Sequence, residues 1–162
     1  TFSDRMTVDL GDRTLQLISY GSGHSTSDIL VVVPEERLLI SGDLFFHRQL
    51  PLVTGDGVPD PARWIAALDE LHELGAIRAV IPGHGEKVTP AELSFFERYV
   101  RWLVAGVDPG RRGEATTESL LSGALGFEHL PGPAPDLDPE VAARIHRANV
   151  AALVARSEPG SG

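Results

Sequence analysis

The feature that most constrains the fold of this chain is a strand–helix–strand succession between residues 37 and 81. Two short apolar runs, "RLLIS" at 37–41 and "IRAVI" at 77–81, have the composition of buried strands. Between them, after an Asp-Pro step that typically opens a helix, apolar residues recur at helical spacing: Trp64, Ile65, Leu68, Leu71 and Leu74. A crossover of this kind places its two strands parallel in one sheet. The sequence therefore predicts an α/β fold with a helix over 61–74.

Two β-hairpins are predicted before this crossover. Alternating apolar residues indicate strands over 6–10 and 14–20, joined by a Gly-Asp turn. The apolar run "ILVVV" at 29–33 is joined to 37–41 by a tight turn that contains a proline. The sheet is therefore expected to be antiparallel up to 37–41 and parallel after it.

A second group of helices is predicted toward the C-terminus. Thr89 and Glu92 have the spacing of a capping box at the start of a helix. Two further helices are predicted over roughly 116–125 and 139–156, after a polar linker that contains glycine. We therefore divide the chain into a first domain over 1–106 and a helical C-terminal extension over 107–162.

The composition restricts the partners and the chemistry of the chain. Its 162 residues carry a formal net charge of −9 and its pI is about 5.0, which argues against a nucleic acid or an anionic membrane as partner. No apolar run reaches the length of a membrane span. We expect a soluble protein that acts on a small-molecule substrate, with the cytoplasm favoured over export and the oligomeric state left open. Because the chain has no cysteine, a bound metal must be held by His, Asp or Glu.

Three candidate metal ligands each follow a predicted strand: His24, Asp43 and His84. The antiparallel hairpin and the parallel crossover bring these strand ends to one edge of the sheet, so we expect the three side chains to meet there. Each stands in a glycine-containing turn, where the backbone can bend sharply. Two imidazoles and one carboxylate suit Zn²⁺. Taken singly, each residue could instead be an ordinary loop histidine or a turn-forming aspartate.

The motifs around these residues, "GSGHSTSD", "ISGDLFF" and "IPGHG", resemble metal-binding motifs of the metallo-β-lactamase-fold hydrolases and occur in the family's order. The resemblance covers roughly residues 1–105 and implies the C-terminal half of an αββα metallo-β-lactamase-like sandwich. It implies that His24 is a ligand of a first metal site, that Asp43 bridges both metals, and that His84 is a ligand of the second site. Asp28 would be a structural residue that holds the His24 loop through hydrogen bonds to the backbone.

One departure from the family pattern limits this resemblance. The signature H-x-H-x-D-H supplies further ligands to both sites, and this chain contains no H-x-H at all. We expect the chain to be a fragment of a longer protein, since it begins abruptly at Thr1. A degenerate remnant of the fold is the alternative. On its own, the chain is expected to bind zinc weakly and to be inactive.

The function that the resemblance implies is that of a zinc-dependent hydrolase. A metal-activated hydroxide would attack an ester, thioester, lactone or lactam-type substrate, and the motifs do not distinguish these classes. The alternative is a non-catalytic remnant or a partner-binding module of the same fold. No residue is assigned a catalytic role apart from metal binding. His47 is expected to be a surface loop residue, and Phe45, Phe46 and Trp64 are expected to lie in the core.

Overall fold

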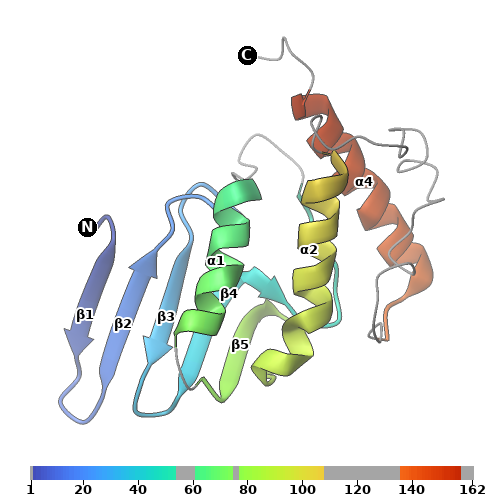
Figure 1. Cartoon of the computed structure of the whole chain (residues 1–162). Helices are drawn as coiled ribbons and strands as arrows, with labels where there is room; N and C mark the ends of the chain where they lie inside the picture. Colours follow the sequence, from blue (N-terminus) through green and yellow to red (C-terminus); the bar gives the residue numbers. More distant parts are fainter. Residues whose placement is uncertain (1, 54–60, 75–76, 108–135, 158–162) are drawn as a thin grey trace. The chain divides into compact units, whose positions relative to one another are not determined.

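The computed structural model of the chain describes residues 2–53, 61–74, 77–107 and 136–157 (Figure 1). The chain forms two compact units. The first comprises Thr1–His47 and Gly57–Ser94, and the second comprises Arg48–Asp56 and Phe95–Gly162. No helix within the described ranges is both long enough and apolar enough to cross a membrane. The division of the chain at residue 106 stays a prediction.

The first unit is built on a five-stranded sheet whose strands follow one another in sequence order (Figure 1). Neighbouring strands from β1 to β4 pair antiparallel, and β5 pairs with β4 in parallel. The strands are β1 (Arg5–Asp9), β2 (Thr14–Ser19), β3 (Ile29–Val33), β4 (Leu38–Phe46) and β5 (Ala79–His84). Both predicted hairpins and the predicted parallel crossover are confirmed, and with them the α/β fold.

The helix α1 (Pro61–Glu73) connects β4 to β5 and lies on one face of the sheet (Figure 1). Its apolar stripe is buried, with Trp64 2% and Leu68 0% exposed. Alternating strand residues on one face of the sheet are also buried: Ile18, Leu30, Val32, Leu39 and Val80. Full burial of each large apolar side chain stabilises the fold by about 1.5–3 kcal/mol, so this layer forms the core of the unit.

Glu70 connects α1 to the N-terminal hairpin. Its carboxylate accepts a hydrogen bond from the Tyr20 hydroxyl and pairs with the guanidinium of Arg5. Burial of the phenol, and then its hydrogen bond to Glu70, raise the pKa of Tyr20 above its usual value. The protonated phenol is therefore the form that joins the helix to the sheet.

The opposite face of the sheet carries an apolar row that crosses all five strands. The strand register places the members of the row side by side: Met6, Leu17, Val31, Ile40 and Ile81. Met6, Ile40 and Ile81 are 37%, 37% and 38% exposed, respectively. A sheet that is apolar on both faces is typical of an inner layer in a layered fold. Within the described residues of the first unit, α1 lies on the other face of this sheet, which corresponds to half of an αββα sandwich (Figure 1).

Two strands extend beyond their predicted bounds. β4 continues from the predicted run at 37–41 to Phe46, and β5 continues from 77–81 to His84. Asp43 and His84 therefore lie within strands, although the sequence suggested that they lie in loops after them. The cause is an irregular pairing of the two strands, which keeps them hydrogen-bonded past the residues where regular pairing was expected to stop.

The described part of the second unit consists mainly of α2 (Ser94–Val107) and α4 (Pro139–Ser157). The 3₁₀-helix η1 (Pro90–Leu93) leads into α2, and its predicted capping box is confirmed. The Thr89 amide donates a hydrogen bond of 2.9 Å to the carboxylate of Glu92. The helix predicted over 139–156 is confirmed by α4. The helix predicted over 116–125 lies outside the described residues, as does Asp60, the aspartate of the Asp-Pro step before α1.

Asn149 of α4 is fully buried and connects this helix to the chain segment at 51–53. Its Oδ1 accepts a hydrogen bond of 2.8 Å from the Val53 amide, and its Nδ2 donates to the Pro51 carbonyl at 2.7 Å. The same Nδ2 donates to the Tyr99 hydroxyl of α2 at 3.0 Å. One amide side chain thus joins both helices to this segment within the second unit.

Candidate metal centre

Asp43 lies close to two imidazoles, those of His24 and His84. Its Oδ2 is 3.9 Å from His24 Nδ1, and its Oδ1 is 3.6 Å from His84 Nε2. The side chains are 21% exposed for His24, 42% for Asp43 and 51% for His84, so a solute can reach all three. The structure therefore brings together the three residues that were predicted from the sequence to meet at one edge of the sheet.

An irregular stretch of β4 directs Asp43 toward the imidazoles. From Ile40 to Phe46, β4 advances six residues (40 to 46), while the paired stretch of β5, which ends at His84, advances three (81 to 84). The surplus residues bulge out of the ladder, as in β-bulges that re-aim a side chain. Gly42 occupies the left-handed region at the start of this stretch, with a φ of +52°. Regular pairing would have placed Asp43 directly opposite His84 instead.

Gly83 leaves room for the carboxylate of Asp43. A Cβ atom at position 83 would lie 2.0 Å from Asp43 Oδ1. It would also lie 2.7 Å from the backbone carbon of Gly42 and 2.8 Å from the backbone nitrogen of Asp43. Real Cβ atoms essentially never make contacts under 3.0 Å. A side chain at this position is therefore incompatible with the observed place of Asp43.

Gly85, on the other side of His84, leaves room for the backbone of His47. Its φ is +94°, and a Cβ there would lie 2.4 Å from the His47 carbonyl oxygen. The His47 amide donates a hydrogen bond of 3.0 Å to the carbonyl of His84. The expectation that His47 is a surface residue is wrong, because this close pairing leaves His47 only 9% exposed. The two glycines thus hold His84 between Asp43 and His47.

The loop that carries His24 is held by Asp28. The carboxylate of Asp28 accepts hydrogen bonds from the amide and the hydroxyl of Ser25, each at 2.8 Å. A Cβ at Gly23 would approach Asp28 Oδ2 to 2.9 Å, so the glycine is needed for the carboxylate to enter the loop. Asp28 is 9% exposed and bonds to the residue next to His24, as the structural role implied by its motif requires.

Two buried aromatic rings contact the imidazoles. The ring centroid of Phe46 lies 4.6 Å from that of His84 and 5.7 Å from that of His24. Trp64 of α1 meets His24 edge-on, with centroids 5.5 Å apart. Both aromatic residues are buried, as predicted, but their contact with the candidate ligands was not predicted from the sequence. The only signal for it is the position of Phe46 shortly after Asp43 in "GDLFF".

The donor types fit a borderline cation such as Zn²⁺, which binds imidazole nitrogen and carboxylate oxygen. They do not complete a coordination sphere. Within the described ranges, no three His, Cys, Asp or Glu side chains are placed to hold a single ion. His24 and His84 instead face different oxygens of Asp43.

Comparisons with known proteins agree with these motifs. The sequence model of the Metallo-beta-lactamase superfamily matches residues 4–84. The metallo-beta-lactamase type 2 of Bacteroides fragilis is 33% identical over 86 residues, which are 52% of this chain and 34% of that protein. This chain therefore spans about a third of the length of that relative.

Solved structures show the same fold. The metallo-beta-lactamase from Pontibacter korlensis is 24% identical, with a TM-score of 0.55 over 62% of this chain and 47% of its own. The stereoselective inverting sec-alkylsulfatase from Pseudomonas sp. is 14% identical, with a TM-score of 0.66 over 96% of this chain and 26% of its own. At these identities the likeness concerns the fold alone.

Proposed function

The chain belongs to the metallo-beta-lactamase superfamily, and on that premise we propose that it is a portion of a metal-dependent hydrolase, to whose metal centre it contributes His24, Asp43 and His84. The observation that carries the proposal is the position of the Asp43 carboxylate, within 4 Å of both imidazoles. Three residues far apart in the sequence meet at this point, and their donor atoms are those that zinc prefers.

Asp43 would serve as the shared ligand of a two-metal site. Its Oδ2 faces His24 and its Oδ1 faces His84, so each oxygen can serve a different ion. Bound zinc would supply Lewis-acid chemistry and lower the pKa of water toward neutrality. The part of this chain is to hold and orient the donor atoms: Gly83 keeps Asp43 in place, and the Asp28 loop keeps His24 in place.

The remaining ligands are proposed to come from the whole protein outside these 162 residues. The chain covers 34% of its Bacteroides fragilis relative, and its apolar sheet face leaves room for a second layer. With at most two of the three donors near either ion, the chain alone is expected to bind zinc weakly and to turn over no substrate. The proposed substrates of the whole protein are small molecules with a hydrolysable ester, thioester, lactone or lactam bond.

A non-catalytic role is the second candidate. It is supported by the incomplete ligand set, since the described residues hold no three-ligand group for one ion. In that case the apolar sheet face would bind a partner, and the three residues would be a remnant of a former centre.

The experiment that separates these candidates measures metal content and hydrolysis in the whole protein. The substrate panel includes an ester, a thioester, a lactone, a β-lactam and a secondary alkyl sulfate, the last because the alkylsulfatase fold covers 96% of this chain. Asp43→Ala should lower the metal content and abolish hydrolysis. Asp12→Ala, which removes a carboxylate that is 73% exposed in the first hairpin, is the matched control and should leave both unchanged. Hydrolysis that persists in Asp43→Ala would refute the proposal, and a wild-type protein without metal or turnover would favour the non-catalytic role.

A further inference from the structure

We propose that Phe46 is a positioning residue of the metal centre, because its ring contacts both imidazoles and sets how they face Asp43. The inference rests on the proposed role of His24 and His84 as ligands. It gives Phe46 a function beyond its place in the core, and it couples two ligands that come from different parts of the sequence.

The contacts of Phe46 are those of an interacting aromatic cluster. Its ring is tilted by 55° to the ring of His84 and by 50° to the ring of His24, with centroids 4.6 and 5.7 Å apart. Aromatic pairs attract one another at these separations when they are tilted or offset. An imidazole binds a metal only along the direction of its ring nitrogen lone pair. The tilt that Phe46 imposes on each ring therefore decides where each donor atom points.

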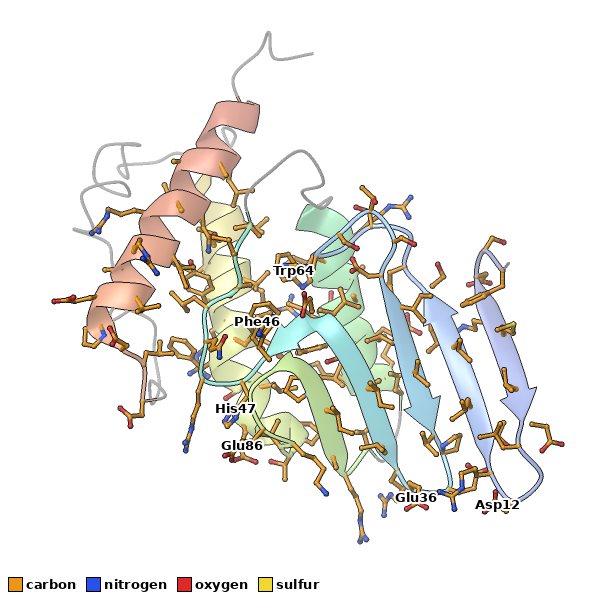
Figure 2. All side chains as sticks on the ribbon, turned by 180° about the vertical axis from the view of Figure 1, so that it is seen from behind. Asp12, Glu36, Phe46, His47, Trp64 and Glu86 are labelled. Carbon is orange, nitrogen blue, oxygen red and sulfur yellow. The ribbon has the colours of Figure 1, made fainter. Side chains whose placement is uncertain are left out.

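Phe46 is itself held in place. Its side chain is 6% exposed, and its backbone pairs with His84 in the β4–β5 ladder. Trp64 also contacts this cluster, with its ring at 78° to that of His24. The Trp64 indole donates a hydrogen bond of 3.0 Å to the carbonyl of Leu44, which places it against the same stretch of β4 (Figure 2). A rigid ring in a defined position can orient a ligand, whereas a mobile one cannot.

The irregular pairing of β4 with β5 explains why the ring of Phe46 can contact both imidazoles. Regular pairing from Ile40 onward would place Asp43 opposite His84. The bulge places Phe46 there instead and leaves Asp43 free to lie between the two imidazoles. The same backbone irregularity thus lets the Asp43 carboxylate lie between the two imidazoles and brings the ring of Phe46 into contact with both imidazoles. Burial alone would require neither arrangement.

The test follows zinc binding to the 162-residue chain by NMR, with ¹⁵N-labelled histidine rings. Phe46→Leu keeps a buried apolar side chain and removes the ring, and Phe46→Tyr keeps the ring. Phe95→Leu makes the same change at a phenylalanine of α2 that is 7% exposed, and it controls for a general loss of packing. Phe46→Leu should change the ring resonances of both His24 and His84 without metal. It should also weaken zinc binding by about 10- to 100-fold, the usual effect of losing a group that orients ligands.

Phe46→Tyr should restore the wild-type affinity, and Phe95→Leu should not lower it. Wild-type zinc affinity in a folded Phe46→Leu variant would overturn the inference. A second measurement needs no variant: nuclear Overhauser contacts from the Phe46 ring protons to both imidazoles must appear in the metal-free wild type, and their absence would also overturn it. If neither imidazole of the wild type responds even to a large excess of zinc, the ligand roles fail, whatever the Overhauser contacts show. The two failures are therefore distinguishable.

Discussion

The substitution Gly83→Ala tests the central geometry of the site through stability alone. Gly83 does not have a left-handed φ, so alanine is compatible with its backbone, and the usual result of such a change is a gain of about 0.4–1 kcal/mol from the less flexible unfolded chain. We expect the opposite here. The added Cβ would lie 2.0 Å from Asp43 Oδ1 and under 3.0 Å from two backbone atoms.

The magnitude follows from which atoms must move. Overpacking of a close-packed site costs about 1–3 kcal/mol, and a cost near the upper end is expected where backbone atoms, rather than a flexible side-chain tip, are in the way. After subtraction of the gain in the unfolded state, the free energy of unfolding should fall by about 2 kcal/mol. With a urea m-value of about 2 kcal/mol per molar, the unfolding midpoint should fall by about 1 M.

Gly42→Ala is the matched control, since Gly42 adjoins the same aspartate. Its φ of +52° disfavours alanine, yet a Cβ there would meet no atom within 4 Å. Gly42→Ala should therefore lower the free energy of unfolding by about 1 kcal/mol, the cost of placing alanine in the left-handed conformation. Urea unfolding of both variants, followed by circular dichroism, gives the comparison. If Gly83→Ala is as stable as the wild type, or less destabilising than Gly42→Ala, then Asp43 does not lie against Gly83.

Three further outcomes follow from the structure. Gly85→Ala should destabilise the chain more than Gly11→Ala, because of the two added Cβ atoms only the one at position 85 meets other atoms. The φ values of the two glycines, +94° and +96°, are alike, so equal urea midpoints for the two variants would contradict this. Tyr20→Phe should cost about 1 kcal/mol at neutral pH through its lost bond to Glu70. Because folding raises the pKa of Tyr20, the wild type should exceed Tyr20→Phe in free energy of unfolding by the full amount below about pH 10 and by less above it. A difference in free energy of unfolding that is unchanged at pH 11 would count against the bond. Asn149→Ala should lower the free energy of unfolding by about 2–4 kcal/mol, since it leaves buried backbone groups without their partner; thermal unfolding within 2 °C of the wild type would exclude that role.

The topology and the meeting of the candidate ligands could be predicted from local patterns. Alternation of period two indicated the hairpins, and the helical spacing from Trp64 to Leu74 indicated the crossover. The parallel rule for crossovers then placed His24, Asp43 and His84 at one edge without any knowledge of side-chain contacts. These inferences need only neighbours in the sequence and one rule of chain connection, so they hold in the structure.

The details that position the side chains could not be predicted in this way. The irregular pairing that frees Asp43 depends on how β4 and β5 meet, which is a contact between distant residues. The burial of His47 depends on Gly85, 38 positions away (85 − 47) and joined to it only through the folded sheet. The hydrogen bonds of Asn149 with the backbone of Pro51 and Val53 likewise join residues that are far apart in the sequence and share no local pattern. Spacing rules describe elements, whereas these contacts are decided when the elements pack.

Whether His24, Asp43 and His84 bind zinc is tested by locating the metal by anomalous X-ray scattering in zinc-soaked crystals of the chain. We expect anomalous density next to Asp43, at the usual ligand distance of about 2.0–2.2 Å from its carboxylate and from at least one of the two imidazoles. Zinc bound only elsewhere on the surface, with His24, Asp43 and His84 all left without a metal, would contradict this expectation.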